Sequence, residues 1–222
     1  MLAHTSYTEL FIVMTNSRGK IVVGLTGGIA CGKSTALLRF KKLGWSVISA
    51  DAIVGQILLE NSNIKNIITQ RWGPELIGDS GNIDKSLMSE IVFTEESERK
   101  WIEGILHPIV RSRWISFVQS CSSGKCMVEI PLLFENKLQN NFTCVLSMFS
   151  PTTTILDRLH KRGLPAPQAQ ARITAQLSPE KKASLANYVL WGGGSSQFLH
   201  AQVDALSSRL LLPKFHSPSH AS

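Results

Sequence analysis

The chain lacks an apolar segment long enough to cross a bilayer. Its longest wholly apolar run near the start, residues 10–14, falls far short of the roughly 20 residues that a membrane helix needs. The same region has neither a basic leader nor a cleavage site, so we read no signal peptide. We expect a cytoplasmic protein with no membrane partner.

Cysteine is also scarce, with 4 residues in a chain of 222. Their spacing shows neither a C-x-x-C pair nor a histidine at the distance that a metal site would need. We therefore expect structural thiols in a reducing compartment. The four residues are Cys31, Cys121, Cys126 and Cys144.

A basic stretch interleaved with aromatic residues is missing as well, although the net charge is +7 and the isoelectric point is about 9.4. A positive field raises the local concentration of phosphates, so nucleic acids and small polyanions both fit the charge. Apart from short pairs such as Lys41-Lys42 and Lys181-Lys182, the basic residues are scattered. This pattern favours a small anionic substrate over DNA or RNA.

One complete phosphate-binding pattern, G-x-x-x-x-G-K-[ST], is present at residues 27–34. It lies between an apolar run at 21–25 and an apolar-periodic segment at 36–40, which is the strand–loop–helix context that the pattern requires. A glycine turn that merely precedes a helix is the alternative. With this context present, the sequence predicts binding of a nucleoside triphosphate.

The loop supplies the candidate nucleotide-binding residues. Backbone N–H groups curl around the β-phosphate, Lys33 offers a cation to the β and γ oxygens, and Ser34 can ligate magnesium. Cys31 is interpreted as a small residue that fits, although a thiol beside Lys33 can be unusually acidic. The candidates are Gly27, Gly28, Ala30, Cys31, Gly32, Lys33, Ser34 and Thr35.

The rest of the chain alternates strands and helices as a βαβ sheet does. With 43% hydrophobic residues, one α/β core with appended helices is favoured over two independent domains. We expect a helix from Ser34 to about Leu43 and a helical insertion over about 57–122, in which Asp84 and Thr94 are plausible N-caps. The predicted strands are 20–25, 46–49, 125–130, 142–148 and 187–191.

Further helix starts follow the fourth strand. Ser150-Pro151 resembles an N-cap and first-turn pair, Pro165 and Pro167 open another helix, and Ser178 starts a third. A closing helix ends near Leu212. We expect a loose extension at 1–19, a kinase-like domain at 20–212, and a disordered tail at 213–222.

Several spaced motifs carry a family resemblance over roughly residues 20–210. They are the phosphate loop with Gly24-Leu25-Thr26 before it, Ile48-Ser49-Ala50-Asp51, Leu106-His107-Pro108, the segment 129–135, and an arginine-rich helix followed by Gln176 and Lys181-Lys182. In content and order they resemble the dephospho-coenzyme A kinase family.

The resemblance implies a P-loop fold with a parallel five-stranded sheet, a helical substrate-binding region and a mobile lid at about 158–183. It also implies an enzyme that transfers the γ-phosphoryl group of Mg-ATP to the ribose 3′-hydroxyl of dephospho-CoA. We expect a monomer or weak oligomer. The alternatives are another small-molecule kinase, such as a nucleoside monophosphate kinase, or a nucleotide-driven switch or ATPase.

Asp51 follows the second strand, and ligands of open parallel sheets collect at the carboxyl ends of strands. There its carboxylate can orient an attacking hydroxyl and accept the proton late in the reaction. Capping the helix that begins near Ala52 is the alternative. We favour catalysis, because the motif aspartate of the family falls at Asp51.

Two glutamates are further candidates. Glu129, at the end of a strand, can hold a magnesium-bound water, although a plain strand-end carboxylate is equally consistent. Glu135 follows an apolar quartet, and the resemblance suggests that it contacts the substrate.

His107 and Pro108 lie inside a helical run, where proline predicts a bend. Arg111 falls on the same helical face as His107. The resemblance makes His107 and Arg111 candidates for binding the acceptor, with Arg113 a weaker one.

Arg158 and Arg162 form an i, i+4 pair before the break at Gly163. Arg162 is predicted to close over the transferring phosphates; Arg158 is left open between this role and a solvated helix face, and Arg172 is a further candidate. The chain departs from the family pattern at Gly192-Gly193-Gly194, which replaces an asparagine-containing turn near the adenine and puts the preference for ATP in doubt.

Overall fold

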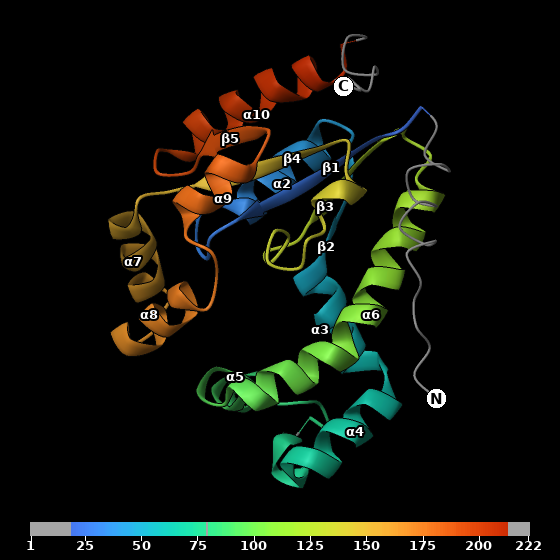
Figure 1. Cartoon of the computed structure of the whole chain (residues 1–222), viewed down its shortest axis with the longest axis vertical. Coiled ribbons are helices and arrows are strands. Elements are labelled where there is room, and N and C mark those ends of the chain that lie inside the picture. Colours follow the sequence, from blue (N-terminus) through green and yellow to red (C-terminus); the bar gives the residue numbers. More distant parts are fainter. Residues whose placement is uncertain (1–18, 79, 213–222) are drawn as a thin grey trace. The chain divides into compact units, whose positions relative to one another are not determined.

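The computed structural model describes residues 19–78 and 80–212 (Figure 1). The predicted tail at 213–222 and all of the predicted extension except Gly19 lie outside these residues. The chain forms two compact units. The first contains the described residues up to Ile48 and those from Ser116 onward, and the second is Ser49–Ile115.

The first unit is built on a five-stranded sheet in the order β2-β3-β1-β4-β5. β1 pairs in parallel with β3 and β4, and β4 pairs in parallel with β5. The predicted α/β fold is therefore confirmed, with β1 at the centre. The strands are β1 (Ile21–Gly27), β2 (Ser46–Ser49), β3 (Lys125–Glu129), β4 (Cys144–Phe149) and β5 (Tyr188–Trp191).

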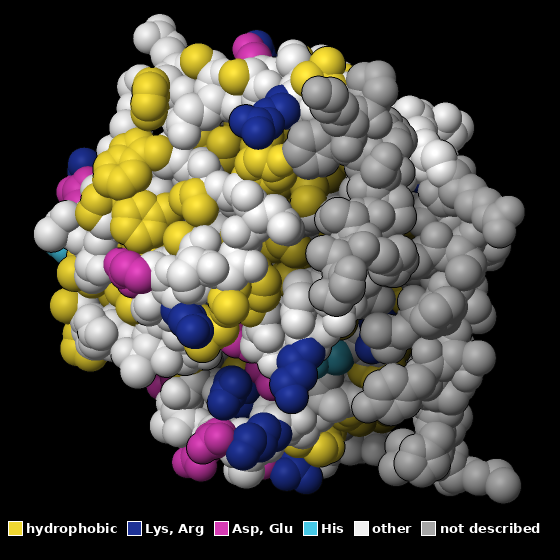
Figure 2. All heavy atoms as spheres, turned by 45° about the horizontal axis from the view of Figure 1, so that its top comes forward, with side chains coloured by type: hydrophobic (Ala, Val, Ile, Leu, Met, Phe, Trp, Pro, Cys, Tyr) yellow, Lys and Arg dark blue, Asp and Glu magenta, His cyan; other side chains and the backbone are white. Residues whose placement is uncertain are grey.

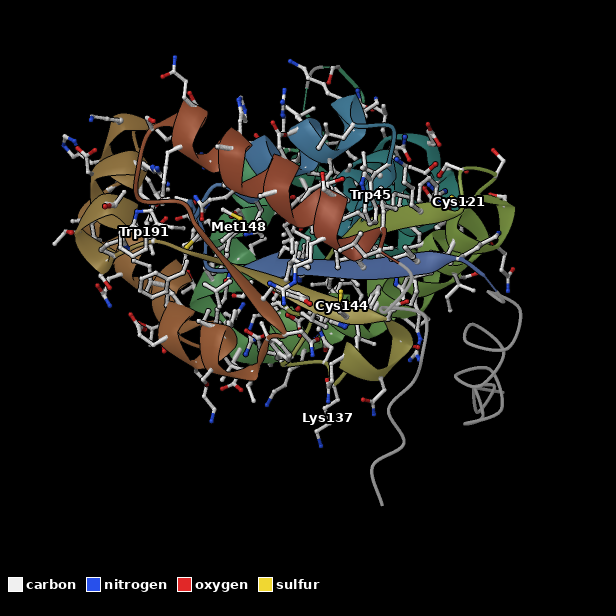
Figure 3. All side chains as sticks on the ribbon, turned by 90° about the horizontal axis from the view of Figure 1, so that it is seen from above. Trp45, Cys121, Lys137, Cys144, Met148 and Trp191 are labelled. Atoms are coloured by element: carbon white, nitrogen blue, oxygen red, sulfur yellow. A yellow bond between two sulfur atoms is a disulfide. The ribbon has the colours of Figure 1, made fainter. Side chains whose placement is uncertain are left out.

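Helices cover both faces of this sheet, as Figure 3 shows: α2 (Lys33–Lys42) and α10 (Ser196–Leu210) lie on one side and α9 (Pro179–Leu185) on the other. Every residue of β1 is buried, which explains its continuous apolar sequence. Trp45 packs edge-on against Phe40 and donates from its indole nitrogen to Ser207 of α10 over 2.8 Å. Some apolar side chains remain at the surface, as one face shows in Figure 2; Trp191 and Phe198 are among the exposed ones.

Two short helices follow β4, namely α7 (Thr152–Lys161) and α8 (Ala166–Thr174). Ser178 caps α9 by accepting from the N–H of Lys181, as predicted. The predicted cap at Ser150 is wrong, because α7 begins after Pro151. The buried hydroxyl of Ser150 instead donates to the carbonyl oxygen of Cys31.

The second unit is helical. Asp84 accepts from the N–H groups of Ser86 and Leu87, so the predicted cap is confirmed. Thr94 is the last residue of its helix and donates to the carbonyl oxygen of Glu90, so the predicted N-cap there is wrong. The elements are α3 (Ala50–Glu60), α4 (Ser62–Trp72), the 3-10 turn η1 (Pro74–Leu76) and α5 (Lys85–Thr94).

Helix α6 (Glu96–Ser120) begins in the second unit and ends in the first. Pro108 lies inside it, and the helix continues beyond that residue. A second 3-10 turn, η2 (Gln139–Asn141), precedes β4.

The expectation of four structural thiols is wrong for two of them, because Cys121 and Cys126 form a disulfide. A turn with Gly124 in the left-handed region (φ 71°) joins the end of α6 to β3 and places the two cysteines side by side. Their separation of five residues matches no familiar motif, so only the tertiary arrangement reveals the pair. Cys31 and Cys144 are buried thiols.

Candidate active site

The phosphate loop follows the central strand β1 and precedes α2, as the sequence predicts. Gly27 has φ of 139° and lies against β4, where an added Cβ would be 2.5 Å from the carbonyl oxygen of Met148. Only glycine fits this approach. The loop therefore leaves the sheet at a position fixed by contact with the neighbouring strand.

The first turn of α2 is open to an anion. Gly32 is its N-cap, with φ of 97°, and no side chain caps the turn. The N–H groups at the start of a helix bind anions, and the helix dipole adds to the attraction. Ser34 is exposed and Thr35 is half-buried in this turn. The geometry fits a bound phosphate group.

Cys31 is wholly buried inside the loop. Burial raises the pKa of its thiol, and the opposing effect of the Lys33 cation is smaller. The interpretation of Cys31 as a small residue that fits agrees with this environment. Its neighbour Ala30 has φ of 57°, a left-handed conformation that non-glycine residues adopt mainly where the surroundings impose it.

Lys33 lies over the loop that precedes it. Its Nζ donates to the carbonyl oxygens of Gly27 and Gly28 at 3.1 and 3.0 Å. The ammonium group is thus held beside the uncapped first turn of α2. A cation there can neutralise phosphate oxygens that bind the turn.

Arg158 of α7 connects the phosphate loop to the segment after β5. Its guanidinium donates to the carbonyl oxygens of Ala30 at 2.9 Å and Gly192 at 2.6 Å, and to the hydroxyl of Ser150 at 3.5 Å. The sequence left the role of Arg158 open. The structure shows that its guanidinium binds the protein's own backbone rather than forming a solvated basic surface.

A cavity of about 180 Å³ lies beside the phosphate loop. Arg162, at the C-cap of α7, borders it together with Thr35. The glycines after β5 form another part of its wall. The lining residues are Ala30, Gly32, Thr35, Arg158, Arg162, Gly192, Gly194, Ser195, Ser196 and Leu199.

The residues predicted to hold magnesium have suitable chemistry. Ser34 places a hydroxyl on the first turn of α2, and Glu129 is a buried carboxylate, 5% exposed, at the end of β3. Glu129 pairs in register with Leu25 of β1, two residues before the loop begins. Magnesium prefers oxygen ligands and often takes only one or two from the protein, so this donor set fits it.

Glu135 lies in the turn after β3, where its Oε1 accepts from the Nζ of Lys182 and from the N–H of Leu177, both at 2.9 Å. Its other oxygen is buried and has no hydrogen-bond partner among the described residues. Contact with a substrate therefore remains a prediction for Glu135. The sequence places Lys182 in a basic pair and in the motifs of the resemblance, but it does not predict this interaction with Glu135.

Three of the residues predicted to handle the acceptor, all except Glu135, belong to the second unit. Asp51 is exposed in the first turn of α3, and the cap of that helix is Ser49, which accepts from the N–H of Ala52 at 3.5 Å. Asp51 is therefore not the N-cap. His107 is exposed and Arg111 half-buried, one turn apart on α6.

Comparisons with known proteins identify the family of the chain. The family model for dephospho-CoA kinase matches residues 21–197. A dephospho-CoA kinase from Legionella pneumophila (strain Paris) is 34% identical over 190 residues, which are 85% of this chain and 94% of the relative. One from Thermosynechococcus vestitus is 35% identical with the same coverage.

Solved structures give the same result. A crystal structure of TT1252 from Thermus thermophilus has a TM-score of 0.72 at 28% identity and covers 87% of this chain and 99% of its own. Dephospho-CoA kinase from Campylobacter jejuni has a TM-score of 0.60 at 28% identity, covering 86% and 98%. With its phosphate loop, its parallel sheet and this match across most of its length, the chain belongs to the dephospho-CoA kinase family.

Proposed function

We propose that the chain is an ATP-dependent kinase that phosphorylates the ribose 3′-hydroxyl of dephospho-CoA, giving coenzyme A and ADP. Membership of the family supports the acceptor. The uncapped first turn of α2, with Lys33 lying over the phosphate loop, is the observation that supports binding of the triphosphate.

The loop residues already named bind the phosphates through their backbone N–H groups. Lys33 and Arg162 stabilise the charge that develops during phosphoryl transfer, in which positioning and electrostatics contribute most of the rate. Ser34 and Glu129 would hold magnesium, either directly or through its water. When bound, the ion would supply positive charge that offsets the charge of the transferring phosphates.

Asp51 aligns the acceptor hydroxyl and takes its proton late, because an ordinary carboxylate is too weak a base to remove it earlier. His107 and Arg111 bind the anionic or ribose part of the acceptor, with Glu135 a further contact. The base of the nucleotide lies toward Gly192-Gly193-Gly194, three residues that have no side chain of their own to read it.

The partner is thus a small molecule, and the basic net charge serves polyanionic ligands rather than nucleic acid. Among the helices of the described residues, none has the length and apolar character needed to cross a membrane. A cytoplasmic enzyme, acting as a monomer or weak oligomer, completes the proposal.

An acceptor screen tests this function. The protein is incubated with Mg-ATP and either dephospho-CoA or nucleoside monophosphates, and the acceptor mass is measured. We expect one added phosphate on dephospho-CoA and none on the nucleotides. Transfer to nucleotides alone identifies a different kinase, and hydrolysis that only a macromolecule stimulates identifies a switch.

The Asp51→Asn variant tests the acceptor site in the same assay. We expect a loss of about 10²–10⁴-fold in rate with the fold intact by circular dichroism. Asp157→Asn is a matched control, because Asp157 is an exposed residue of α7 that forms an ion pair with Lys161. Full transfer by a folded Asp51→Asn protein contradicts the role of Asp51.

A further inference from the structure

A fully buried lysine lies at the point where the predicted lid returns to the sheet. Lys182 of α9 is 0% exposed. Its Nζ donates to the carbonyl oxygen of Pro131 at 2.6 Å and to Oε1 of Glu135 at 2.9 Å, with Oε1 of Gln176 at 3.5 Å. Three acceptors therefore surround the ammonium group, which matches its three donors.

The partners of Lys182 come from two separate segments. Pro131 and Glu135 lie in the turn after β3, and Gln176 lies between the end of α8 and the start of α9. The same oxygen of Glu135 also accepts from the N–H of Leu177. The carboxylate thus binds the backbone of the connector between α8 and α9 and, through Lys182, helix α9 itself.

This cluster also contacts the phosphate loop. The hydroxyl of Thr26, one residue before the loop begins, donates to the same carbonyl oxygen of Pro131 at 3.0 Å. Pro179, at the start of α9, packs on the loop: an added Cβ at Gly28 would lie 3.2 Å from its Cγ. The connector, the turn after β3 and the loop therefore meet around one ion pair, in which the lysine is fully buried and the glutamate half-buried.

A contribution to stability explains such a pair poorly. Burial lowers the pKa of Lys182 because it removes water from the charge, and the pairing with Glu135 offsets only part of this effect. A buried ion pair often adds no stability over apolar side chains of similar volume. We therefore expect the pair to act by holding the connector, the turn after β3 and the phosphate loop in one arrangement.

We propose that Lys182 and Glu135 are positioning residues that fix the connector between α8 and α9, and with it the phosphate loop and helix α7, which carries Arg158 and ends at Arg162. This inference rests on the proposed kinase function. Neither residue needs to contact the reacting atoms. Their effect is on how closely the arginines and the loop match the transferring phosphoryl group.

The double variant Glu135→Leu with Lys182→Met separates positioning from stability, because it replaces the pair by apolar side chains of similar size. We expect an unchanged or raised unfolding midpoint, a kcat about 100-fold lower, and an affinity for Mg-ADP within about threefold of the wild type. Trypsin is expected to cleave faster after Arg172. The single variant Lys182→Arg, which keeps the charge and its hydrogen-bond donors, is expected to have a kcat much closer to the wild type than that of the double variant.

A matched control removes another ion pair of the first unit. Arg39 and Asp204 join α2 to α10 through a bidentate pair remote from the connector in sequence. The variant Arg39→Met with Asp204→Leu is expected to keep the wild-type kcat and the wild-type rate of tryptic cleavage.

A folded Glu135→Leu/Lys182→Met protein with wild-type kcat and cleavage overturns the proposal. If that variant does not fold, Glu135→Gln removes the charge of the carboxylate while keeping the size of the side chain, and wild-type kcat and cleavage in a stable Glu135→Gln protein overturn the proposal equally. Absence of phosphoryl transfer in the wild type refutes the kinase function instead. The tryptic comparison still tests the connector in that case.

Discussion

Arg158 donates from its Nη2 to the carbonyl oxygen of Gly192 across 2.6 Å, which ties helix α7 to the segment that follows the last strand. The other nitrogen of the same guanidinium binds Ala30 of the phosphate loop. One side chain therefore sets the spacing between the two walls of the candidate nucleotide pocket.

Replacing Arg158 by methionine is expected to weaken nucleotide use. Two backbone carbonyls lose a charged donor, and a hydrogen bond to a charged group contributes about 1.5–3 kcal/mol. We therefore expect kcat/KM for ATP to fall by roughly 10–100-fold in steady-state assays. Lys161→Met on the same helix, where the lysine is exposed and pairs with Asp157, is the control and should change nothing. Equal kinetics for both variants would show that the link is dispensable.

Gly192 is expected to tolerate no side chain. A Cβ at this position collides with the carbonyl oxygen of Cys31, so Gly192→Ala should cost about 1–3 kcal/mol in unfolding free energy and weaken binding of Mg-ATP. Gly104→Ala is the control, since no atom lies within 4 Å of its added Cβ. Alanine in that helix should be neutral or stabilising by up to about 1 kcal/mol. Chemical denaturation of both variants measures the difference, and equal stability would contradict the close approach.

Cys31 is expected to react slowly with alkylating reagents. Burial raises the pKa of its thiol, and the thiolate is the reactive form, so labelling of the folded protein near neutral pH should be at least about tenfold slower than in denaturant. Cys144, whose pKa burial raises to about 12, provides a comparison. Peptide mass spectrometry over time measures both rates. Rapid labelling of Cys31 alone would indicate an acidic, reactive thiol.

We expect the contribution of Glu98 to the free energy of unfolding to depend on pH. Hydrogen bonds from Arg71 and Trp72 hold the pKa of this carboxyl at about 2 rather than 4.5. The native state therefore favours the ionised form, and its stabilisation is present above 4.5 and is lost as the pH falls toward about 2. Urea denaturation should show Glu98→Gln less stable than the wild type near neutral pH, with a gap that narrows in acid. A gap independent of pH would contradict the ion pair.

Much of the fold could be predicted because its signals are local. The phosphate loop is a continuous pattern between a buried strand and an amphipathic helix, and caps such as Asp84 and Ser178 act on N–H groups two or three residues away. The wrong cap at Ser150 arose where a tertiary contact competes with a local signal. Ser150 resembles a cap, yet its hydroxyl bonds to Cys31 in the loop.

The internal contacts of the site could not be predicted in the same way. Arg158 and Gly192 are 34 residues apart, and Glu135 and Leu177 are 42 apart. Only the sheet order brings their segments together. In the sheet β1 lies between β3 and β4, whereas along the chain β1 comes before both. The disulfide between Cys121 and Cys126 depends likewise on how α6 turns into β3.

Calorimetric titration with Mg-ATP tests the central claim most directly. We predict binding to the wild-type protein with a dissociation constant below about 1 mM. Binding should weaken at least about tenfold in Lys33→Met. It should be unchanged in Lys41→Met, a change of an exposed lysine at the other end of α2. Failure of the wild type to bind Mg-ATP, or equal binding by the Lys33→Met protein, would contradict the account.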